Sequence, residues 1–146
     1  MDGATCDMSS LLVLSSNTGN TRTFVDFICK HGTESIHICE DFNCNISDYD
    51  KIAFGSYTWG NGKIPSEMKE FLIDNHKDLK GKEVFIFGSG HSIYPNFCGA
   101  VDGISKICRD SGAIIKCSYK FEQRFIEEEY SPEELDNLAS VIKKFF

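Results

Sequence analysis

The sequence lacks long hydrophobic runs, Cys-x-x-Cys pairs and an excess of basic residues, and each absence excludes a class of protein. Its longest apolar runs, residues 11–14 and 84–87, are far shorter than the roughly 20 residues of a membrane-spanning helix. The chain does not begin with a basic segment followed by an apolar one, so we expect no secretory signal peptide. These features predict a soluble, cytoplasmic protein.

Basic residues are scarce: 15 Lys and Arg stand against 22 Asp and Glu, which gives a net charge of -7. An acidic surface repels nucleic acid and anionic lipid, so neither is expected as a partner. The seven cysteines are odd in number and lack the spacing of zinc ligands. We therefore expect free thiols in a reducing compartment, with neither a metal site nor a disulfide framework.

The rest of the composition is that of an ordinary folded domain. The chain has 146 residues, of which 41% are hydrophobic and 25% charged. A domain of this length buries roughly 70% of its unfolded surface, so it forms a core without a metal or a disulfide. We expect one domain over residues 1–146, with residues 1–9 as a flexible lead-in.

Short apolar runs alternate with amphipathic stretches along the chain. Strands are expected at residues 11–15, 35–39, 51–55, 82–88 and 114–119, the first of them a buried parallel strand. Helical spacing fills the intervals, except that the polar segment between the second and third strands has room for one helical turn at most. One helix is expected to have a proline in its first position and the last to open with a capping box, at Pro65 and Ser131 respectively. The order predicts an α/β fold, a doubly wound parallel sheet with helices on both faces.

Three loops at the expected carboxyl ends of strands carry the unusual residues, and ligands of such sheets bind at these ends. The first loop, residues 15–21, offers hydroxyls, an amide and backbone N–H groups at a helix start, which suit a small terminal phosphate. It lacks the lysine of a P-loop and the G-x-G-x-x-G spacing of a dinucleotide site. A plain helix N-cap is the alternative interpretation.

The second and third loops contribute aromatic side chains. The second, residues 56–64, holds the only tryptophan of the chain, Trp59, and the third, residues 89–98, holds Tyr94 before Pro95. Beside a phosphate site, these two side chains suit the two faces of a flat ring. The alternatives are a tryptophan that caps the edge of the core and a tyrosine that packs on its own loop.

Three motifs, in this order and with this spacing, resemble those of flavodoxins. Residues 16–21 are similar to the flavodoxin phosphate loop, residues 58–62 to the first flavin loop, and residues 88–98 to the second flavin loop. The similarity covers essentially the whole chain, and the uninterrupted fifth strand matches the short-chain subclass. It implies a five-stranded sheet of order 2-1-3-4-5 and a non-covalently bound FMN. It further implies an electron-transfer protein, and not an enzyme, that carries one electron at a time and stabilises the neutral semiquinone.

The resemblance also assigns the cofactor-binding residues. Trp59 would stack on the inner face of the isoalloxazine ring and Tyr94 on the outer face. Gly60 and Asn61 both adopt positive φ readily, so the peptide between them would flip its carbonyl toward the N5 hydrogen of the semiquinone. The expected residues are Ser16, Asn17, Thr18, Gly19, Asn20 and Thr21 for the phosphate, and Ser56, Tyr57, Thr58, Trp59, Gly60, Asn61, Gly62, Ser89, Gly90, His91, Tyr94, Phe97 and Cys98 around the rest of the cofactor.

His91 departs from the family pattern, which usually has Asp at this place. The loss of that negative charge is expected to ease formation of the anionic, fully reduced flavin, more so below pH ~6.5, where an imidazole becomes charged. Replacement of His91 with Asp would then lower the second reduction potential. The alternative is that His91 points into solvent and has little effect.

Acidic residues gather in the C-terminal half: Glu122, Glu127, Glu128, Glu129, Glu133, Glu134 and Asp136. They are either a solvated face or a rim that docks basic patches on redox partners. The expected partners are a donor of the flavodoxin or ferredoxin reductase type and a reductive enzyme as acceptor, with the protein itself a monomer.

Three other functions compete with this interpretation. A flavodoxin-like protein dedicated to ribonucleotide reductase activation shares the first loop, the reduced second crossover and a sequence such as residues 120–122, but its third loop differs. A flavin quinone reductase needs a nicotinamide pocket and a dimer element, for which 146 residues leave little room. A phosphoacceptor receiver domain needs an Asp where this chain has Gly55 and Ser56.

Overall fold

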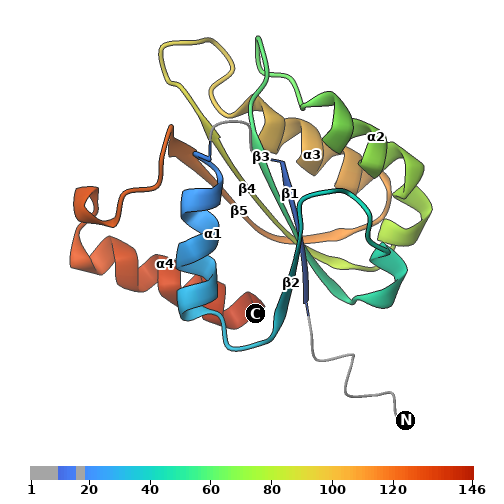
Figure 1. Ribbon diagram of the computed structural model, residues 1–146, viewed down its shortest axis with the longest axis horizontal. Coiled ribbons are helices and arrows are strands. Elements are labelled where there is room, and N and C mark those ends of the chain that lie inside the picture. Colours follow the sequence, from blue (N-terminus) through green and yellow to red (C-terminus); the bar gives the residue numbers. More distant parts are fainter. Residues whose placement is uncertain (1–9, 16–18) are drawn as a thin grey trace.

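The computed structural model describes residues 10–15 and 19–146, and within them it contains one parallel five-stranded sheet of order β2-β1-β3-β4-β5 (Figure 1). This confirms the predicted fold class and strand order. The strands are β1 (Ser10–Ser15), β2 (Ile36–Cys39), β3 (Lys51–Tyr57), β4 (Glu83–Gly90) and β5 (Ile114–Glu122).

The order of the strands creates one switch point, between β1 and β3. From β1 the chain first adds β2 on one side and then returns to add β3, β4 and β5 on the other. The loops that leave the carboxyl ends of β1 and β3 therefore diverge, and such a divergence opens a crevice for a ligand. The described residues of the loops that follow β1, β3 and β4 lie at this edge of the sheet, as predicted.

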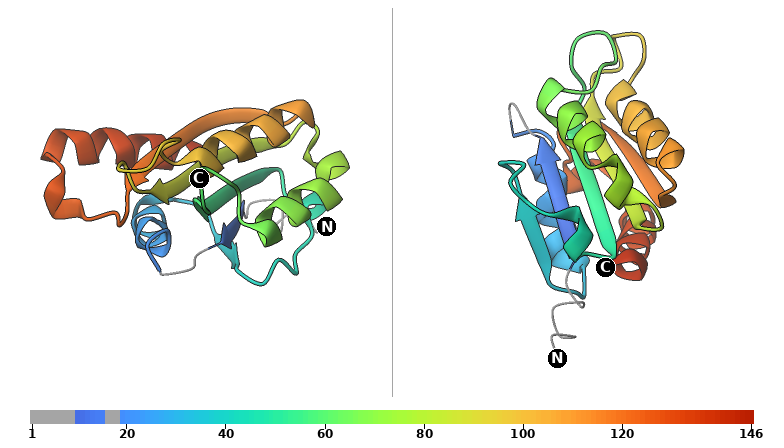
Figure 2. Two further views of the ribbon diagram at one scale, coloured as in Figure 1. Left: turned by 90° about the horizontal axis from the view of Figure 1, so that it is seen from above. Right: turned by 90° about the vertical axis from the view of Figure 1, so that its right-hand side faces the viewer.

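Helices cover both faces of the sheet, as Figures 1 and 2 show: α1 and α4 on one face, α2 and α3 on the other. The capping box predicted at the last helix is present, with the Ser131 hydroxyl accepting from Glu134 N (3.1 Å) and the Glu134 carboxylate accepting from Ser131 N (2.8 Å). Pro65 is the N-cap of its helix and not the first helical residue, because its ψ of 142° is extended. The helices are α1 (Arg22–His31), α2 (Ser66–Asp74), α3 (Gly99–Asp110) and α4 (Pro132–Phe145).

The second crossover contains only a short 3₁₀ turn, η2 (Ile46–Asp48), as its polar sequence predicts. β3 and β5 extend two and three residues past their expected ends at residues 55 and 119, because both continue to pair with β4. The last pairs are Tyr57 with Ser89 and Gly90 with Glu122. This extension carries the residues after β3 and β5 up to the edge where the three loops meet.

Two hydrophobic clusters hold the layers together. The cluster under α2 and α3 is mainly aliphatic, with Leu11, Ile52 and Ile104 among its members. The cluster under α1 and α4, called the phenylalanine cluster below, contains most of the 12 phenylalanines of the chain, with Phe24 and Phe85 fully buried. In the described part of the chain, no helix is long and apolar enough to cross a membrane.

Candidate cofactor site

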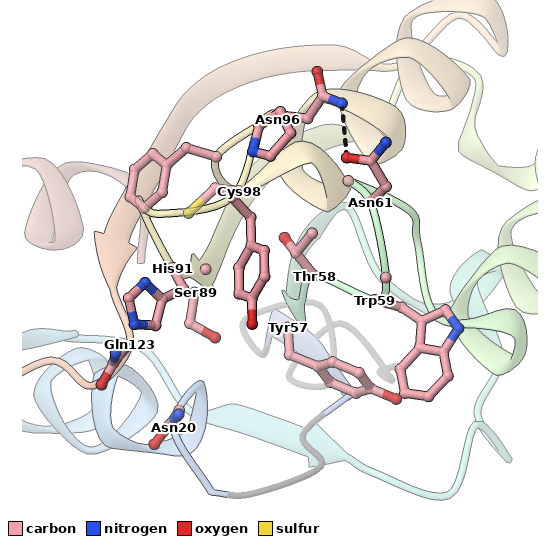
Figure 3. A pocket seen from close by; sticks show the side chains of 16 residues that line it. Asn20, Tyr57, Thr58, Trp59, Asn61, Ser89, His91, Asn96, Cys98 and Gln123 are labelled. Atoms are coloured by element: carbon pink, nitrogen blue, oxygen red, sulfur yellow. Dashed lines mark hydrogen bonds between the residues drawn. The ribbon is translucent and has the colours of Figure 1, made fainter.

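A pocket of about 760 Å³ opens at the carboxyl edge of the sheet, between the loops that follow β3 and β4 (Figure 3). Asn20, just before α1, and Gln123, just after β5, complete its wall. Its volume is typical of sites that bind a small organic cofactor. Thirteen of the predicted site residues line it: Asn20, Tyr57, Thr58, Trp59, Gly60, Asn61, Gly62, Ser89, Gly90, His91, Tyr94, Phe97 and Cys98.

Two aromatic side chains of this pocket are largely exposed, although aromatic residues usually bury most of their surface. Trp59 is 57% exposed and Tyr94 is 59% exposed, and each comes from a different loop. The exposure of Trp59 speaks against the alternative that it caps the edge of the core. Tyr94 packs edge-on against the His91 ring of its own loop, with centroids 5.7 Å apart, and also faces the pocket.

The loop that carries Trp59 is shaped by its own backbone. Trp59 and Lys63 exchange two hydrogen bonds, each 2.8 Å from N to O, which close a tight turn. Gly60 and Gly62 have φ values of +51° and +80°, a region that residues with a side chain rarely adopt. Positive φ was predicted to be accessible to Gly60 and Asn61; the structure has it at Gly60 and at Gly62, but not at Asn61.

The loops after β3 and β4 are in close contact. A Cβ atom at Gly99, the first residue of α3, would lie 2.5 Å from the carbonyl oxygen of Gly62, so the approach of the two loops requires a glycine. The Asn96 amide donates to Asn61 Oδ1 (3.4 Å), drawn as the dashed line in Figure 3, and Ala100 N donates to Thr58 Oγ1 (3.3 Å). The two walls of the pocket are thus one connected unit.

The first loop is described only in part. Ser16, Asn17 and Thr18, predicted to bind a phosphate, lie outside the described residues. The Thr21 side chain makes no cap bond at the start of α1, and its hydroxyl instead lies 3.0 Å from the hydroxyl of Ser89 at the end of β4. This buried contact ties the first loop to the third.

Among the predicted residues that the structure describes, three do not line the pocket, and three lining residues were not predicted. Gly19 is half-buried, whereas Thr21 and Ser56 are buried, and the Ser56 hydroxyl donates to the Tyr57 carbonyl (2.7 Å). The unpredicted lining residues are Pro95, Asn96 and Gln123. Pro95 and Asn96 stand within the third loop, while only the rule that ligands bind at strand ends could have singled out Gln123.

Cys98 closes the pocket from behind as a neutral group. It is buried, has a φ of +51°, and its sulfur lies 3.6 Å from the carbonyl oxygens of both Gly88 and Phe121. Burial raises the pKa of this thiol to about 11. Cys98 therefore contributes packing and hydrogen bonds to the wall and no charge.

A doubly wound sheet with an open, aromatic pocket at its switch edge defines a class of proteins that bind a mononucleotide with a flat ring. The sequence agrees, because residues 12–136 match the family model described as Flavodoxin. The chain is 36% identical to the probable flavodoxin 2 of Bacillus subtilis strain 168, over 92% of this chain and 93% of that protein. It is 34% identical to the flavodoxin of Maridesulfovibrio salexigens, over 73% of this chain and 80% of that one.

Solved structures give the same result. The crystal structure of oxidised flavodoxin 1 from Bacillus cereus superposes with a TM-score of 0.78 at 26% identity, over 94% of this chain and 99% of that chain. The chain belongs to the flavodoxin family. It is accordingly an FMN-binding electron-transfer protein and not an enzyme.

Proposed function

We propose that the chain shuttles single, low-potential electrons between redox proteins, with the FMN ring held in this pocket between Trp59 and Tyr94. The observation that carries the proposal is the exposure of two aromatic side chains, from different loops, on one open pocket. Their rings supply contact area for a flat ring, whose own chemistry provides one-electron transfer. The chain contributes binding, orientation and charge.

The phosphate of FMN is proposed to bind at the first loop, where the positive end of α1 favours an anion. Ser16, Asn17, Thr18 and Asn20 are the proposed side-chain ligands. Thr21 would contribute its backbone N–H, because its hydroxyl is engaged by Ser89. Gly19 has a φ of +82°, a left-handed conformation of the kind found in turns whose successive N–H groups bind anions.

The peptide between Gly60 and Asn61 is the proposed device that favours the neutral semiquinone. A carbonyl turned toward the ring would accept a hydrogen bond that only this redox state offers. A Cβ atom on Gly60 would meet no atom within 4 Å, so the space around this peptide leaves room for the rotation. Ser89, Gly90 and His91 are proposed to contact the pyrimidine end of the ring through their backbone.

The partners are proposed to be redox proteins with basic patches, which would dock over the pocket mouth. Exposed Ile93 adds to the apolar area that Trp59 and Tyr94 present there. Acidic residues at η4 (Glu127–Glu129) and at the start of α4 would attract such partners and make association depend on salt. A docking contact of this kind is small and transient, which suits a monomeric carrier in the cytoplasm.

The test is stepwise anaerobic reduction of the FMN-loaded protein, followed by absorption spectroscopy. The proposal predicts a blue neutral semiquinone as an intermediate, and replacement of Gly60 by Ala should lower its maximum yield by hindering the rotation. Bleaching in one two-electron step would overturn the one-electron carrier. A protein that refuses added FMN would overturn the site as well.

A further inference from the structure

The carboxylate of Glu122, at the end of β5, holds the backbone of the third loop. Ser92 N donates to both carboxylate oxygens, at 3.0 and 2.9 Å, and the Ser92 hydroxyl donates to Oε1 at 2.9 Å. Hydrogen bonds to a charged acceptor are about twice as strong as those between neutral groups. They lower the pKa of Glu122, the backbone hydrogen bond from Ser92 having the largest effect.

Through this contact, β5 stays hydrogen-bonded to the third loop beyond the end of the sheet. The last pair of the sheet is Gly90 with Glu122, and Gln123 N then donates to Gly90 O (2.7 Å) from a residue with a φ of +49°. The Glu122 side chain adds hydrogen bonds to Ser92, two residues beyond Gly90. Ser92 stands between His91 and Tyr94, both of which line the pocket.

His91 faces the same carboxylate. Its Nδ1 lies 3.6 Å from Glu122 Oε1 and 3.3 Å from Ile93 N, so a neutral ring accepts from Ile93 and a protonated ring pairs with Glu122. Tyr94 stands edge-on to the His91 ring. Lys120, the nearest cation on β5, is engaged by Asp102 at 2.9 Å.

We propose that Glu122 is a positioning residue for the cofactor: it holds Ser92 so that His91 and Tyr94 line the pocket, and its charge disfavours the anionic, fully reduced flavin. The proposal rests on the proposed FMN site. It places a carboxylate from β5 next to His91, which stands where the family usually has Asp. Position and charge are separate consequences of one side chain, and they can be tested separately.

The experiment measures FMN affinity and both one-electron potentials for the wild type and three variants. In Glu122→Gln the charge is lost and the hydrogen bonds from Ser92 become weaker. The weaker hold on the loop should lower the affinity for oxidised FMN about tenfold, and the loss of charge should raise the second potential. In Glu122→Asp the charge is kept on a shorter side chain, so affinity should fall while the second potential changes less. Glu70→Gln, an exposed site on α2, removes the same charge away from the pocket and should resemble the wild type.

A double-mutant cycle with Ser92→Ala adds a direct test of the contact. The effects of Ser92→Ala and Glu122→Gln on FMN affinity should be less than additive, because Ser92→Ala removes the hydroxyl hydrogen bond that Glu122→Gln weakens. Variants of Glu122 that match the wild type in affinity and potential, or that match Glu70→Gln in their effects, overturn the role of Glu122 alone. A folded wild type that binds no FMN overturns the proposed function, and this proposal with it.

Discussion

The phenylalanine cluster and the pocket are both rich in aromatic side chains, yet they use them in opposite ways. Phe24 is fully buried and its ring packs against five others, including Phe87 and Tyr119. Trp59 and Tyr94 leave more than half of their surface open. The buried rings contribute to the free energy of folding, whereas the open rings keep their contact area for a ligand.

The two regions are nevertheless adjacent and linked. Phe121 belongs to the phenylalanine cluster, and its carbonyl oxygen lies 3.6 Å from the sulfur of Cys98 on the pocket wall. Through such contacts the packed phenylalanine cluster holds the backbone of the pocket loops, although it does not bury their aromatic side chains. The comparison therefore predicts that substitutions in the two regions separate folding stability from cofactor affinity.

Phe24→Ala should have the largest effect. It removes the ring at the centre of the phenylalanine cluster and should lower the free energy of unfolding by about 3–5 kcal/mol. Urea denaturation of the apoprotein measures this loss, and the folded fraction should still bind FMN with near wild-type affinity. Phe24→Leu is the control and should cost less, while a loss below about 1 kcal/mol for the Ala variant would contradict the role of the cluster.

Gly99→Ala should affect both properties, because the new Cβ atom would lie 2.5 Å from the Gly62 carbonyl oxygen where the two loops meet. We expect the free energy of unfolding to fall by about 1–3 kcal/mol and FMN affinity to fall about tenfold. Gly103→Ala on the same helix is the matched control, since its Cβ would approach side-chain atoms of Ile64, at 2.9 Å, and no backbone of another segment. If the two variants behaved alike, the close contact of the loops would not matter for binding.

Trp59→Ala should change FMN affinity and leave folding nearly intact. The free energy of unfolding should stay within about 0.5 kcal/mol of the wild type, because an exposed side chain is removed. Affinity should fall roughly tenfold to hundredfold through the loss of stacking area. Calorimetric titration with FMN checks this, with Trp59→Phe as the variant that keeps a ring. A loss of stability with unchanged affinity would assign Trp59 to the fold.

The smallest expected effect is on the melting temperature at acidic pH. Backbone hydrogen bonds lower the pKa values of Asp41, Glu122 and Glu134, the donors being Asn43, Ser92 and Ser131. A carboxyl group whose pKa is lower in the folded state contributes stability above its unfolded pKa of about 4, and this is lost as pH falls through the folded value. The melting temperature should thus fall below pH of about 4, less steeply in Glu134→Gln. An equal slope in both proteins would contradict the contribution of that helix cap.

The sequence is sufficient to predict the elements whose signals are local. Continuous apolar runs identify the buried strands, and the Ser131 capping box identifies the start of α4. The rule that ligands bind at strand ends singled out the three loops, and the resemblance to flavodoxins assigned the thirteen residues within them that line the pocket. The places of Gln123 and Glu122 depend instead on the register of β5 against β4, which shifts between Val84 and Phe85, and no spacing within either strand reveals such a shift.

The contact between Ser92 and Glu122 shows the same limit at the level of side chains. The two residues are far apart in the sequence and meet only because β5 continues past its predicted end. His91 was expected either to act through its charge or to point into solvent. The structure puts it beside a carboxylate, and its effect on the potential stays a prediction.

The most direct test of the FMN position uses the fact that Trp59 is the only tryptophan of the chain. The apoprotein is titrated with FMN while tryptophan emission and flavin emission are recorded together. If the ring stacks on Trp59, tryptophan emission should be strongly quenched, with a break at one FMN per chain. Flavin emission that reports binding while tryptophan emission stays unchanged would show that the ring lies elsewhere.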